Sequence, residues 1–410
     1  MKRILIFSLA YVPYAGGAEL AIKEITDRLD PDEFAFDMIT LRFDRKLPAV
    51  ETIGNITVHR IGFAAEDVKV SDRALPLSCR LAKFLFPFTS FFKALSLHRR
   101  TKYDLIWAMM ANQAGFGALF FSASLKLRRT GKRVPYFLEL QDGTPLARVR
   151  SRRPITTLLW PLYRAIYRKA DVIKAISSFI KDLAREAGYA GRIEVIPNGV
   201  DVTQFSAPVP DDELAELKAK VGKKMGDVLL FTASRLVLSR GVEDIIRALA
   251  HLPPHVKLLI AGDGEDRKKL DDIARQSGVA ERVMFAGHIA HADIPNRLKI
   301  SDIFVRPSII EGMGSAFVEA FAAGVPVVAT PVGGIPDFLS DPDRNPDEEP
   351  TGLFCNVRDP ESIARAVKRY MDDPVLAARI VKNAKELATQ KYDWNIVARD
   401  MREKIFERLI

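Results

Sequence analysis

Residues 304–337 read FVRPSIIEGMGSAFVEAFAAGVPVVATPVGGIPD, and this stretch decides the fold. A short apolar run at its start is typical of a buried strand, and a proline and a loop with two glycines follow it. Residues 316–323 are almost all helix formers, and Gly324 supplies a C-terminal stop. A second apolar run at 327–329 indicates another strand. The order strand, glycine loop, helix and strand predicts an α/β fold.

The start of this predicted helix favours a negatively charged ligand. Ser315 is expected to be the N-cap residue, because its hydroxyl can accept a hydrogen bond from a free backbone N–H. Free N–H groups and the helix dipole together attract anions. Glu311 lies in the loop and Glu319 lies about 6 Å along the helix, so both would repel a bare phosphate. A nucleotide sugar satisfies both requirements, because its phosphates can accept from the backbone amides and its hydroxyls can donate to the two carboxylates. The alternative interpretation is a Rossmann-type helix whose two glutamates are only solvated.

Two glutamates with seven residues between them, glycines after the first, a Gly-x-Pro-Val-Val run and Gly-Gly-Ile-Pro form one motif. This motif resembles that of the family-4 retaining glycosyltransferases of the GT-B fold. The resemblance extends over nearly the whole chain and is strongest in residues 190–395. It implies an α/β protein with two Rossmann-like domains facing a cleft. It also implies a C-terminal helix that crosses back to the first domain.

The resemblance implies a role for each residue of the motif. Glu311 would contact the transferred sugar, and Glu319 would hold the ribose of the nucleotide. Backbone amides of the loop and the helix start would receive the sugar and the diphosphate, and by position these amides belong to Gly312, Met313, Gly314, Ser315, Ala316 and Phe317.

A second charged turn lies at 234–241, SRLVLSRG, between a predicted strand and a helix from 242. Arg235 and Arg240 flank this turn and can converge on a diphosphate with forked hydrogen bonds. Relatives commonly have Arg and then Lys at these places, so Arg240 takes the Lys position. Both would stabilise the charge that grows on the leaving phosphate, one donor being worth about 3–4 kcal/mol. The alternative is a pair of solvated surface cations.

Further donor contacts are predicted at three loops. Gly264 ends the turn after a predicted strand at 258–261, and His288 and Ile289 occupy the loop where relatives receive the base. Gly17 lies in a glycine turn before a helix, where backbone can approach a phosphate closely. That turn lacks the Gly-x-Gly-x-x-Gly fingerprint of dinucleotide sites, and a Gly-Gly pair is usually only a turn.

The turn at 141–144 departs from the family pattern. Many relatives have a histidine near the reacting sugar here, but all six histidines of this chain lie elsewhere. Asp142 follows the carboxyl end of a predicted strand, where open sheets bind ligands, and could orient or deprotonate the acceptor hydroxyl. A turn or N-cap aspartate is an equally good interpretation. In a front-face retaining transfer the leaving phosphate can itself take the acceptor proton, so a general base is the lesser need.

A length of 410 residues indicates two domains. We assign 1–205, together with a C-terminal helix at 392–410, to an acceptor-binding domain and 206–391 to a nucleotide-sugar-binding domain. Cys79 and Cys355 are far apart and have no metal-type spacing, which favours a reducing compartment. The apolar N-terminus lacks a small-residue cleavage pattern and suits a first strand better than a signal peptide.

The net charge of +9 is unevenly distributed. Residues 1–205 hold 32 Lys and Arg against 20 Asp and Glu, and within 73–174 the count is 20 against 4. Such a basic half suggests an anionic partner. Segment 73–102 combines five phenylalanines, cationic ends and no acid, as an interfacial membrane segment requires; core helices split by Pro87 are the alternative. No nucleic-acid-binding motif is present, so we expect no nucleic-acid partner.

Two sequence patterns resemble the metal motif of the other glycosyltransferase fold. These are Asp30-x-Asp32 and Asp341-x-Asp343, but each has a proline in the middle and neither follows a core strand. We therefore expect no metal and no cofactor, with the nucleotide-diphosphate sugar acting as co-substrate.

The sequence thus predicts a cytoplasmic retaining hexosyltransferase, peripheral on the membrane, that moves a sugar to a hydroxyl of a glycan or lipid-linked acceptor in polysaccharide or glycolipid synthesis. A nucleotide-sugar epimerase of the same fold is one alternative. A nicotinamide oxidoreductase is disfavoured, because neither half has the full glycine fingerprint. A non-catalytic glycan- or membrane-binding protein is a further alternative, suggested by the missing histidine.

Overall fold

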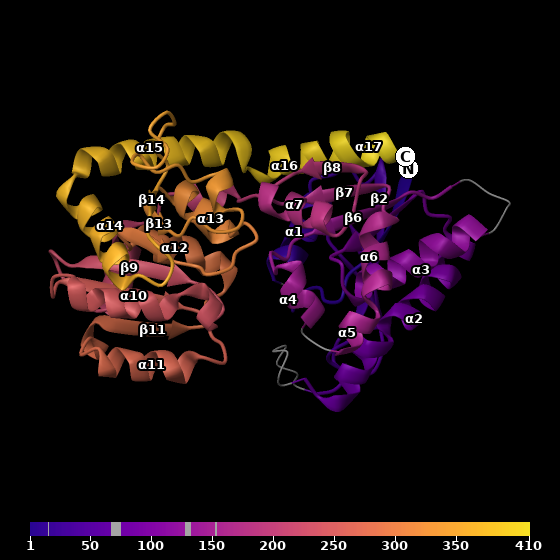
Figure 1. Ribbon diagram of the computed structural model, residues 1–410, viewed down its shortest axis with the longest axis horizontal. Coiled ribbons are helices and arrows are strands. Elements are labelled where there is room, and N and C mark those ends of the chain that lie inside the picture. Colours follow the sequence, from indigo (N-terminus) through magenta and orange to yellow (C-terminus); the bar gives the residue numbers. More distant parts are fainter. Residues whose placement is uncertain (15, 67–74, 128–132, 152–153) are drawn as a thin grey trace. The chain divides into compact units, whose positions relative to one another are not determined.

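The structure is a computed structural model that describes residues 1–14, 16–66, 75–127, 133–151 and 154–410. It contains two compact units (Figure 1). Unit 1 comprises residues 1–198 and 394–410, and unit 2 comprises residues 199–393. Each unit is built around its own predominantly parallel sheet.

The described part of unit 1 has eight strands: β1 (Lys2–Phe7), β2 (Phe34–Leu41), β3 (Val50–Ile53), β4 (Ile56–Ile61), β5 (Leu105–Met109), β6 (Tyr136–Leu140), β7 (Val172–Ala175) and β8 (Arg192–Val195). Their order in the sheet is β3-β4-β2-β1-β5-β6-β7-β8. All neighbours pair in parallel except β3 and β4. Every residue of β5 and β6 is buried, as expected for the central strands of a parallel sheet.

Within the ranges that the structure describes, seven helices connect these strands: α1 (Gly17–Thr26), α2 (Leu77–Arg100), α3 (Gln113–Leu127), α4 (Leu146–Ser151), α5 (Pro154–Leu158), α6 (Trp160–Arg168) and α7 (Ser178–Glu186). The alternative interpretation of this segment, a pair of core helices split by Pro87, is wrong, because α2 continues through Pro87 as one helix. A proline removes one backbone hydrogen bond from a helix. Packing along α3, which buries Phe86 and Ser90 on the same face, holds α2 together across that gap.

The C-terminal segment belongs to unit 1 and comprises α16 (Trp394–Met401), a π-helical turn (Arg402–Phe406) and α17 (Glu407–Leu409). Phe406 is fully buried, and its ring centroid lies 5.8 Å from that of Phe34, 5.7 Å from Trp107 and 6.0 Å from Phe137. The predicted return of the C-terminal helix to the first domain is confirmed.

Unit 2 has six strands: β9 (Val228–Ala233), β10 (Val256–Ala261), β11 (Val283–Gly287), β12 (Ile303–Arg306), β13 (Val327–Ala329) and β14 (Leu353–Phe354). Their order is β11-β10-β9-β12-β13-β14, and all pairs are parallel. The helices are α8 (Val202–Ser206), α9 (Asp211–Lys220), α10 (Val242–Ala248), α11 (Arg267–Gln276), α12 (Ile294–Lys299), α13 (Ser315–Ala323), α14 (Pro360–Asp372) and α15 (Pro374–Lys391). The predicted strand, helix and strand of the stretch 304–337 are β12, α13 and β13.

The boundary between the units falls earlier than the one drawn at 205/206. Residues 199–205 belong to unit 2, because Phe205 is fully buried and α8 packs against α13. At the other end, Tyr392 and Asp393 also belong to unit 2. The Val200 N–H donates to the Tyr392 carbonyl at 2.7 Å, which ties the two chain segments together inside this unit.

We predict that Phe406→Ala destabilises the protein by about 3–5 kcal/mol, because it leaves a cavity among four aromatic rings. Urea denaturation followed by circular dichroism measures this loss. The exposed Glu403 on the same turn is the matched control, and Glu403→Ala should change stability by less than about 0.5 kcal/mol. Equal effects of the two substitutions would contradict the anchoring role of Phe406.

Candidate functional site

The loops that follow β9 and β12 leave the same edge of the unit 2 sheet. From β9 the chain continues to β10 and β11 on one side, and it then returns to place β12 on the other side of β9. Loops at such a reversal point diverge and leave an opening at the carboxyl ends of the strands, which is where open α/β sheets bind ligands. Arg235 and Arg240 lie after β9, and Glu311 lies after β12.

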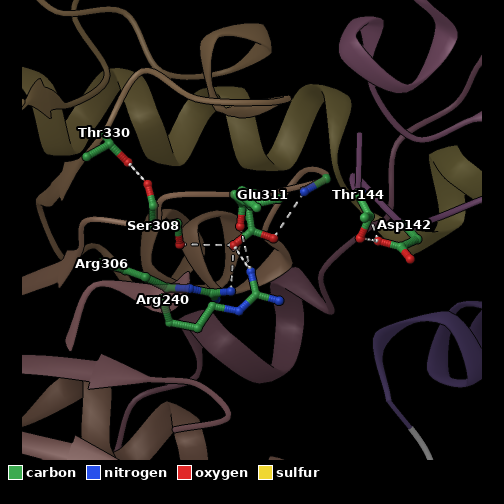
Figure 2. Close-up of polar contacts among 9 residues, drawn as sticks. Asp142, Thr144, Arg240, Arg306, Ser308, Glu311 and Thr330 are labelled. Carbon is green, nitrogen blue, oxygen red and sulfur yellow. Dashed lines mark hydrogen bonds and ion pairs between the residues drawn. The ribbon is translucent and has the colours of Figure 1, made fainter. Parts of the chain in front are cut away.

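Glu311 is held by three side chains (Figure 2). Its Oε2 atom accepts hydrogen bonds from Arg240 Nη1 at 2.7 Å, Arg306 Nη2 at 2.6 Å and Ser308 Oγ at 3.2 Å. The Gly312 N–H donates to Oε1 at a longer 3.3 Å. The residue is only 6% exposed, so these donors fix its carboxylate in one orientation.

Burial opposes ionisation of Glu311, but the charges of Arg306 and Arg240 outweigh it and lower the pKa of this carboxyl. Arg306 experiences the same burial, which lowers the pKa of its guanidinium. The cluster of Arg240, Arg306 and Glu311 therefore carries a net positive charge at neutral pH. This charge suits a site for an anion.

Arg306 is a site residue that the sequence did not reveal. It lies in β12, it is 7% exposed, and its Nε atom has no hydrogen-bond partner in the part of the chain that the structure describes. Its guanidinium carbon lies 5.4 Å from the centroid of the Phe317 ring. The available signal was a cation at the end of an otherwise apolar strand, where a solvated arginine is not expected.

The loop that carries Arg235 and Arg240 is bonded to the loop after β10. The Leu236 N–H donates to the Asp263 carbonyl at 2.9 Å, and the Leu238 N–H donates to the Asp266 carboxylate at 2.9 Å. Gly264 permits this approach, since a Cβ there would lie 2.3 Å from the Leu236 carbonyl oxygen. Arg235 is exposed, and its side chain has no hydrogen bond or ion pair with any described residue.

The start of α13 differs in one detail from the prediction. The N-cap is Gly314 and not Ser315, which is the first helical residue. Gly314 has a positive φ of 89°, and a Cβ there would lie 2.6 Å from the Phe317 ring, so a serine cannot replace it at the cap. Met313 and Phe317 are buried, so these two residues offer only backbone groups to a ligand. The N–H groups of Ser315 and Ala316 have no acceptor among the described residues, as at most helix starts.

Glu319 lies one turn further along α13, where its Oε1 atom is 3.0 Å from Nε2 of His291. Sequence reasoning missed His291, although the spacing His288-Ile289-Ala290-His291 offered a signal. His288 and Ile289 follow the carboxyl end of β11. The Gly262 N–H donates to the Gly287 carbonyl at 2.6 Å and so joins this loop to the one that contains Gly264.

Two predicted site residues lie in unit 1. Gly17 is the first residue of α1, and a Cβ there would meet nothing within 4 Å, so space is open beside this turn. The Oδ1 atom of Asp142 accepts from the N–H of Thr144 at 2.9 Å and from its hydroxyl at 2.7 Å (Figure 2). These two bonds are the contacts of a turn aspartate, which is one of the two interpretations that the sequence allows for Asp142. The side chain is nevertheless exposed, so its second oxygen can reach a ligand.

A buried polar network supports the turn that begins at Gln141. Glu139 and Lys174 form a fully buried ion pair between β6 and β7, and Trp107 Nε1 donates to Glu139 Oε2 at 3.0 Å. Gln141 and Asn198 exchange amide hydrogen bonds of 3.0 and 2.7 Å. No local sequence pattern indicates this network, because its bonds between Trp107 and Glu139, Lys174 and Glu139, and Gln141 and Asn198 join residues 32 to 57 positions apart.

The two Asp-x-Asp patterns form turns in the structure. Asp30 and Asp341 each accept a hydrogen bond at 2.9 Å from the backbone N–H two residues later. Asp341 is buried and also accepts from the Phe354 N–H at 2.6 Å, so it organises a loop. Within the described ranges, no group of three or more His, Cys, Asp or Glu side chains is placed to hold a metal ion.

Comparison with known proteins identifies the family of this chain. The model of the family "Glycosyltransferase Family 4" matches residues 15–204, and that of "Glycosyl transferases group 1" matches residues 214–387. An uncharacterised glycosyltransferase of Methanocaldococcus jannaschii is 26% identical over 407 residues, which cover 97% of this chain and 96% of the relative.

Solved structures share the fold over the whole chain. Sucrose-phosphate synthase of Thermosynechococcus elongatus superposes with a TM-score of 0.81 at 22% identity, covering 100% of this chain and 99% of the other. HepE of Anabaena, solved in complex with UDP-glucose, has a TM-score of 0.74 at 21% identity, covering 99% and 100%. The fold, with two Rossmann-like units that each contain a predominantly parallel sheet, is that of the GT-B glycosyltransferases. The chain belongs to the family-4 glycosyltransferases of that fold.

We predict that Arg306→Met destabilises unit 2 by about 3–5 kcal/mol at pH 7, because it removes one partner of a buried ion pair. The double variant Arg306→Met with Glu311→Gln should recover part of this loss, since no buried carboxylate remains. Urea denaturation measures all variants, and the exposed Arg235→Met is the matched control, with an expected change below about 0.5 kcal/mol.

The effect of Arg306→Met should also depend on pH. The lowered pKa of Glu311 means that its ion pairs contribute fully above the unfolded pKa of about 4.3 and are lost as the pH falls through the folded pKa. The difference between wild type and variant should therefore shrink in acid. A difference that stays constant between pH 7 and pH 3 would contradict the ion-pair role of Arg306.

Proposed function

We propose that this glycosyltransferase moves a hexosyl unit from a nucleotide-diphosphate sugar to a hydroxyl of a glycan or lipid-linked acceptor, with retention and without a metal. The observation that carries this proposal is the buried Glu311 carboxylate, fixed by two arginines at the opening of a glycine-capped helix. A nucleotide-diphosphate sugar matches both parts of such a site. The structural similarity to HepE, which binds UDP-glucose, supports a donor of this class.

Each part of the donor has a partner in unit 2. The diphosphate meets Arg235, whose guanidinium has no protein partner among the described residues, and the free N–H groups at the start of α13. Arg240 is oriented by Glu311 and by the Ile310 carbonyl at 3.2 Å, so its position is set before the ligand binds. As the bond between sugar and phosphate breaks, these fixed charges stabilise the negative charge on the leaving diphosphate.

The neutral parts of the donor meet the carboxylates. Among the described residues, Oε1 of Glu311 has only the long contact with Gly312, and it can accept a hydrogen bond from a sugar hydroxyl. Glu319, positioned by His291, accepts from the ribose hydroxyls, and the loop at His288 and Ile289 receives the base. Asp142 in unit 1 orients the acceptor hydroxyl, and the leaving phosphate takes its proton.

We predict that Arg235→Ala lowers turnover more than about a hundredfold while the fold persists, because one preorganised donor to a developing charge is worth about 3–4 kcal/mol. Release of nucleoside diphosphate from a panel of nucleotide sugars, with and without acceptor, measures turnover. Arg275→Ala on the exposed face of α11 is the matched control. A near-normal rate for Arg235→Ala would remove its assigned role, and isomerised donor without transfer would favour an epimerase.

We further propose that unit 1 works on the cytoplasmic face of an anionic membrane. Along α2, Leu77, Leu81, Phe84, Phe88 and Phe92 recur every three or four residues and are between 48% and 82% exposed, so they form one apolar stripe. The last turn of α2 carries His98, Arg99 and Arg100, and the helix has no acid. An apolar stripe with cationic ends suits the interface of an anionic bilayer. Among the described residues, no helix is long and apolar enough to cross a membrane.

We predict that replacing Phe84, Phe88 and Phe92 with serine lowers co-sedimentation with phosphatidylglycerol vesicles about tenfold or more, because three exposed rings are lost from the interface. Replacing the exposed Met225, Val357 and Val375 of unit 2 with serine is the matched control and should leave sedimentation unchanged. Equal binding of both triple variants would show that α2 does not contact the membrane.

A further inference from the structure

A second hollow lies in unit 1, between α4, α5, α6 and the end of α7. Its volume is about 430 Å³, and its polar and aromatic lining consists of Arg150, Ser151, Thr157, Trp160, Arg164 and Glu186. These residues belong neither to the sequence motifs described above nor to the proposed donor site. A hollow of this size accommodates one sugar residue together with a charged substituent.

Two guanidinium groups at this hollow are free to bind a ligand. Arg164 donates through Nε to the Ala187 carbonyl at 2.8 Å, which fixes the side chain. Its terminal nitrogens have no acceptor among the residues that the structure describes. Arg150 lies over the Trp160 ring, 5.8 Å from its centroid, and likewise has no ion pair with a described residue. Arginine forks of this kind match the oxygen atoms of a phosphate.

The remaining lining suits a sugar ring. Trp160 is half-buried and stacks on Tyr163, with ring centroids 5.1 Å apart and an interplanar angle of 12°. Tyr163 and the Arg150 guanidinium both lie against this ring, so a sugar in the hollow can meet its edge. The Ser151 and Thr157 hydroxyls and the exposed Glu186 carboxylate offer polar partners for sugar hydroxyls.

The hollow adjoins the turn that carries Asp142. Leu146, the first residue of α4, lines the hollow and lies four residues after Asp142 in the chain. Burial raises the pKa of Tyr163, and the negative charge of Asp142 raises it too. Tyr163 is also the ring on which Trp160 stacks. A ligand in the hollow would therefore extend toward the carboxyl end of β6.

We infer that this hollow is an acceptor subsite that binds a sugar carrying a phosphate group, with the phosphate at Arg150 and Arg164 and the sugar ring beside the edge of Trp160. The assignment of the ligand as the acceptor rests on the proposed glycosyl transfer. The phosphate belongs either to a soluble sugar phosphate or to the diphosphate of a lipid-linked sugar, and the chemistry at the arginines is the same for both.

Trp160 gives a direct readout of binding. The chain has three tryptophans, and Trp107 and Trp394 are 0% and 4% exposed, so acrylamide quenches mainly Trp160. We expect glucose 1-phosphate, or glucose linked to a prenyl diphosphate in detergent micelles, to protect Trp160 of the full-length protein from quenching. The ligand that protects at the lower concentration shows whether the phosphate belongs to a soluble sugar phosphate or to a lipid-linked sugar. Methyl α-glucoside and inorganic phosphate should protect at least about tenfold less well, since each lacks one half of the ligand.

Three substitutions test the location. Arg150→Gln and Arg164→Lys should raise the half-protecting concentration at least about tenfold, because a charged fork is lost. Arg168→Gln, on the exposed part of α6 outside the hollow, is the matched control and should change nothing. Arg150 is exposed, so its substitution does not threaten folding even if that of Arg164 does.

The outcomes separate this inference from the proposed function. Protection that is unchanged in both Arg150→Gln and Arg164→Lys, absent with both sugar phosphates, or equal with methyl α-glucoside or inorganic phosphate would overturn the subsite. Protection that persists in Arg235→Ala supports a subsite independent of the donor loops. If protection follows the arginines but no nucleotide sugar is turned over, the subsite stands and the proposed transfer fails.

Discussion

One buried carboxylate with two guanidinium partners sets the geometry of unit 2. Glu311 would be costly to bury alone, and Arg306 inside β12 and Arg240 after β9 make its burial possible. Because the two arginines come from adjacent strands, their shared partner ties the loops after β9 and β12 together. The opening at the sheet reversal thereby becomes a fixed, positively charged site. Removing Glu311 would leave the buried Arg306 guanidinium without its ion-pair partner.

Unit 1 also contains a buried ion pair at the carboxyl ends of its strands. Glu139 and Lys174 pair between β6 and β7 with no exposure to solvent, and Trp107 on β5 supplies a further donor. The network continues through Gln141 to Asn198, the last residue of the unit before the chain enters unit 2. In each unit a buried ion pair thus holds the backbone at the carboxyl ends of parallel strands. Exposed side chains such as Asp142 and Arg235 are then presented from a rigid support.

Close backbone approach explains why the loops of unit 2 require glycine. Gly314 and Gly264 lie where a side chain would collide with the Phe317 ring or with the Leu236 carbonyl. The first brings the start of α13 next to Glu311, and the second joins the loops after β9 and β10. The proposed donor site is therefore assembled from three loops that touch through their backbones, and its arginines and carboxylates project from this common base.

The sequence by itself determined the α/β class, the strands at 105–109, 136–140 and 327–329, and the positions of Glu311, Arg235 and Arg240, because apolar period and turn residues are local properties. Only the tertiary structure decided that Gly314 caps α13, that α2 continues through Pro87, and that residues 199–205 belong to unit 2. It alone also revealed Arg306, His291 and the pair of Glu139 with Lys174. These features depend on contacts between segments distant in sequence, and no local pattern of residues encodes such contacts.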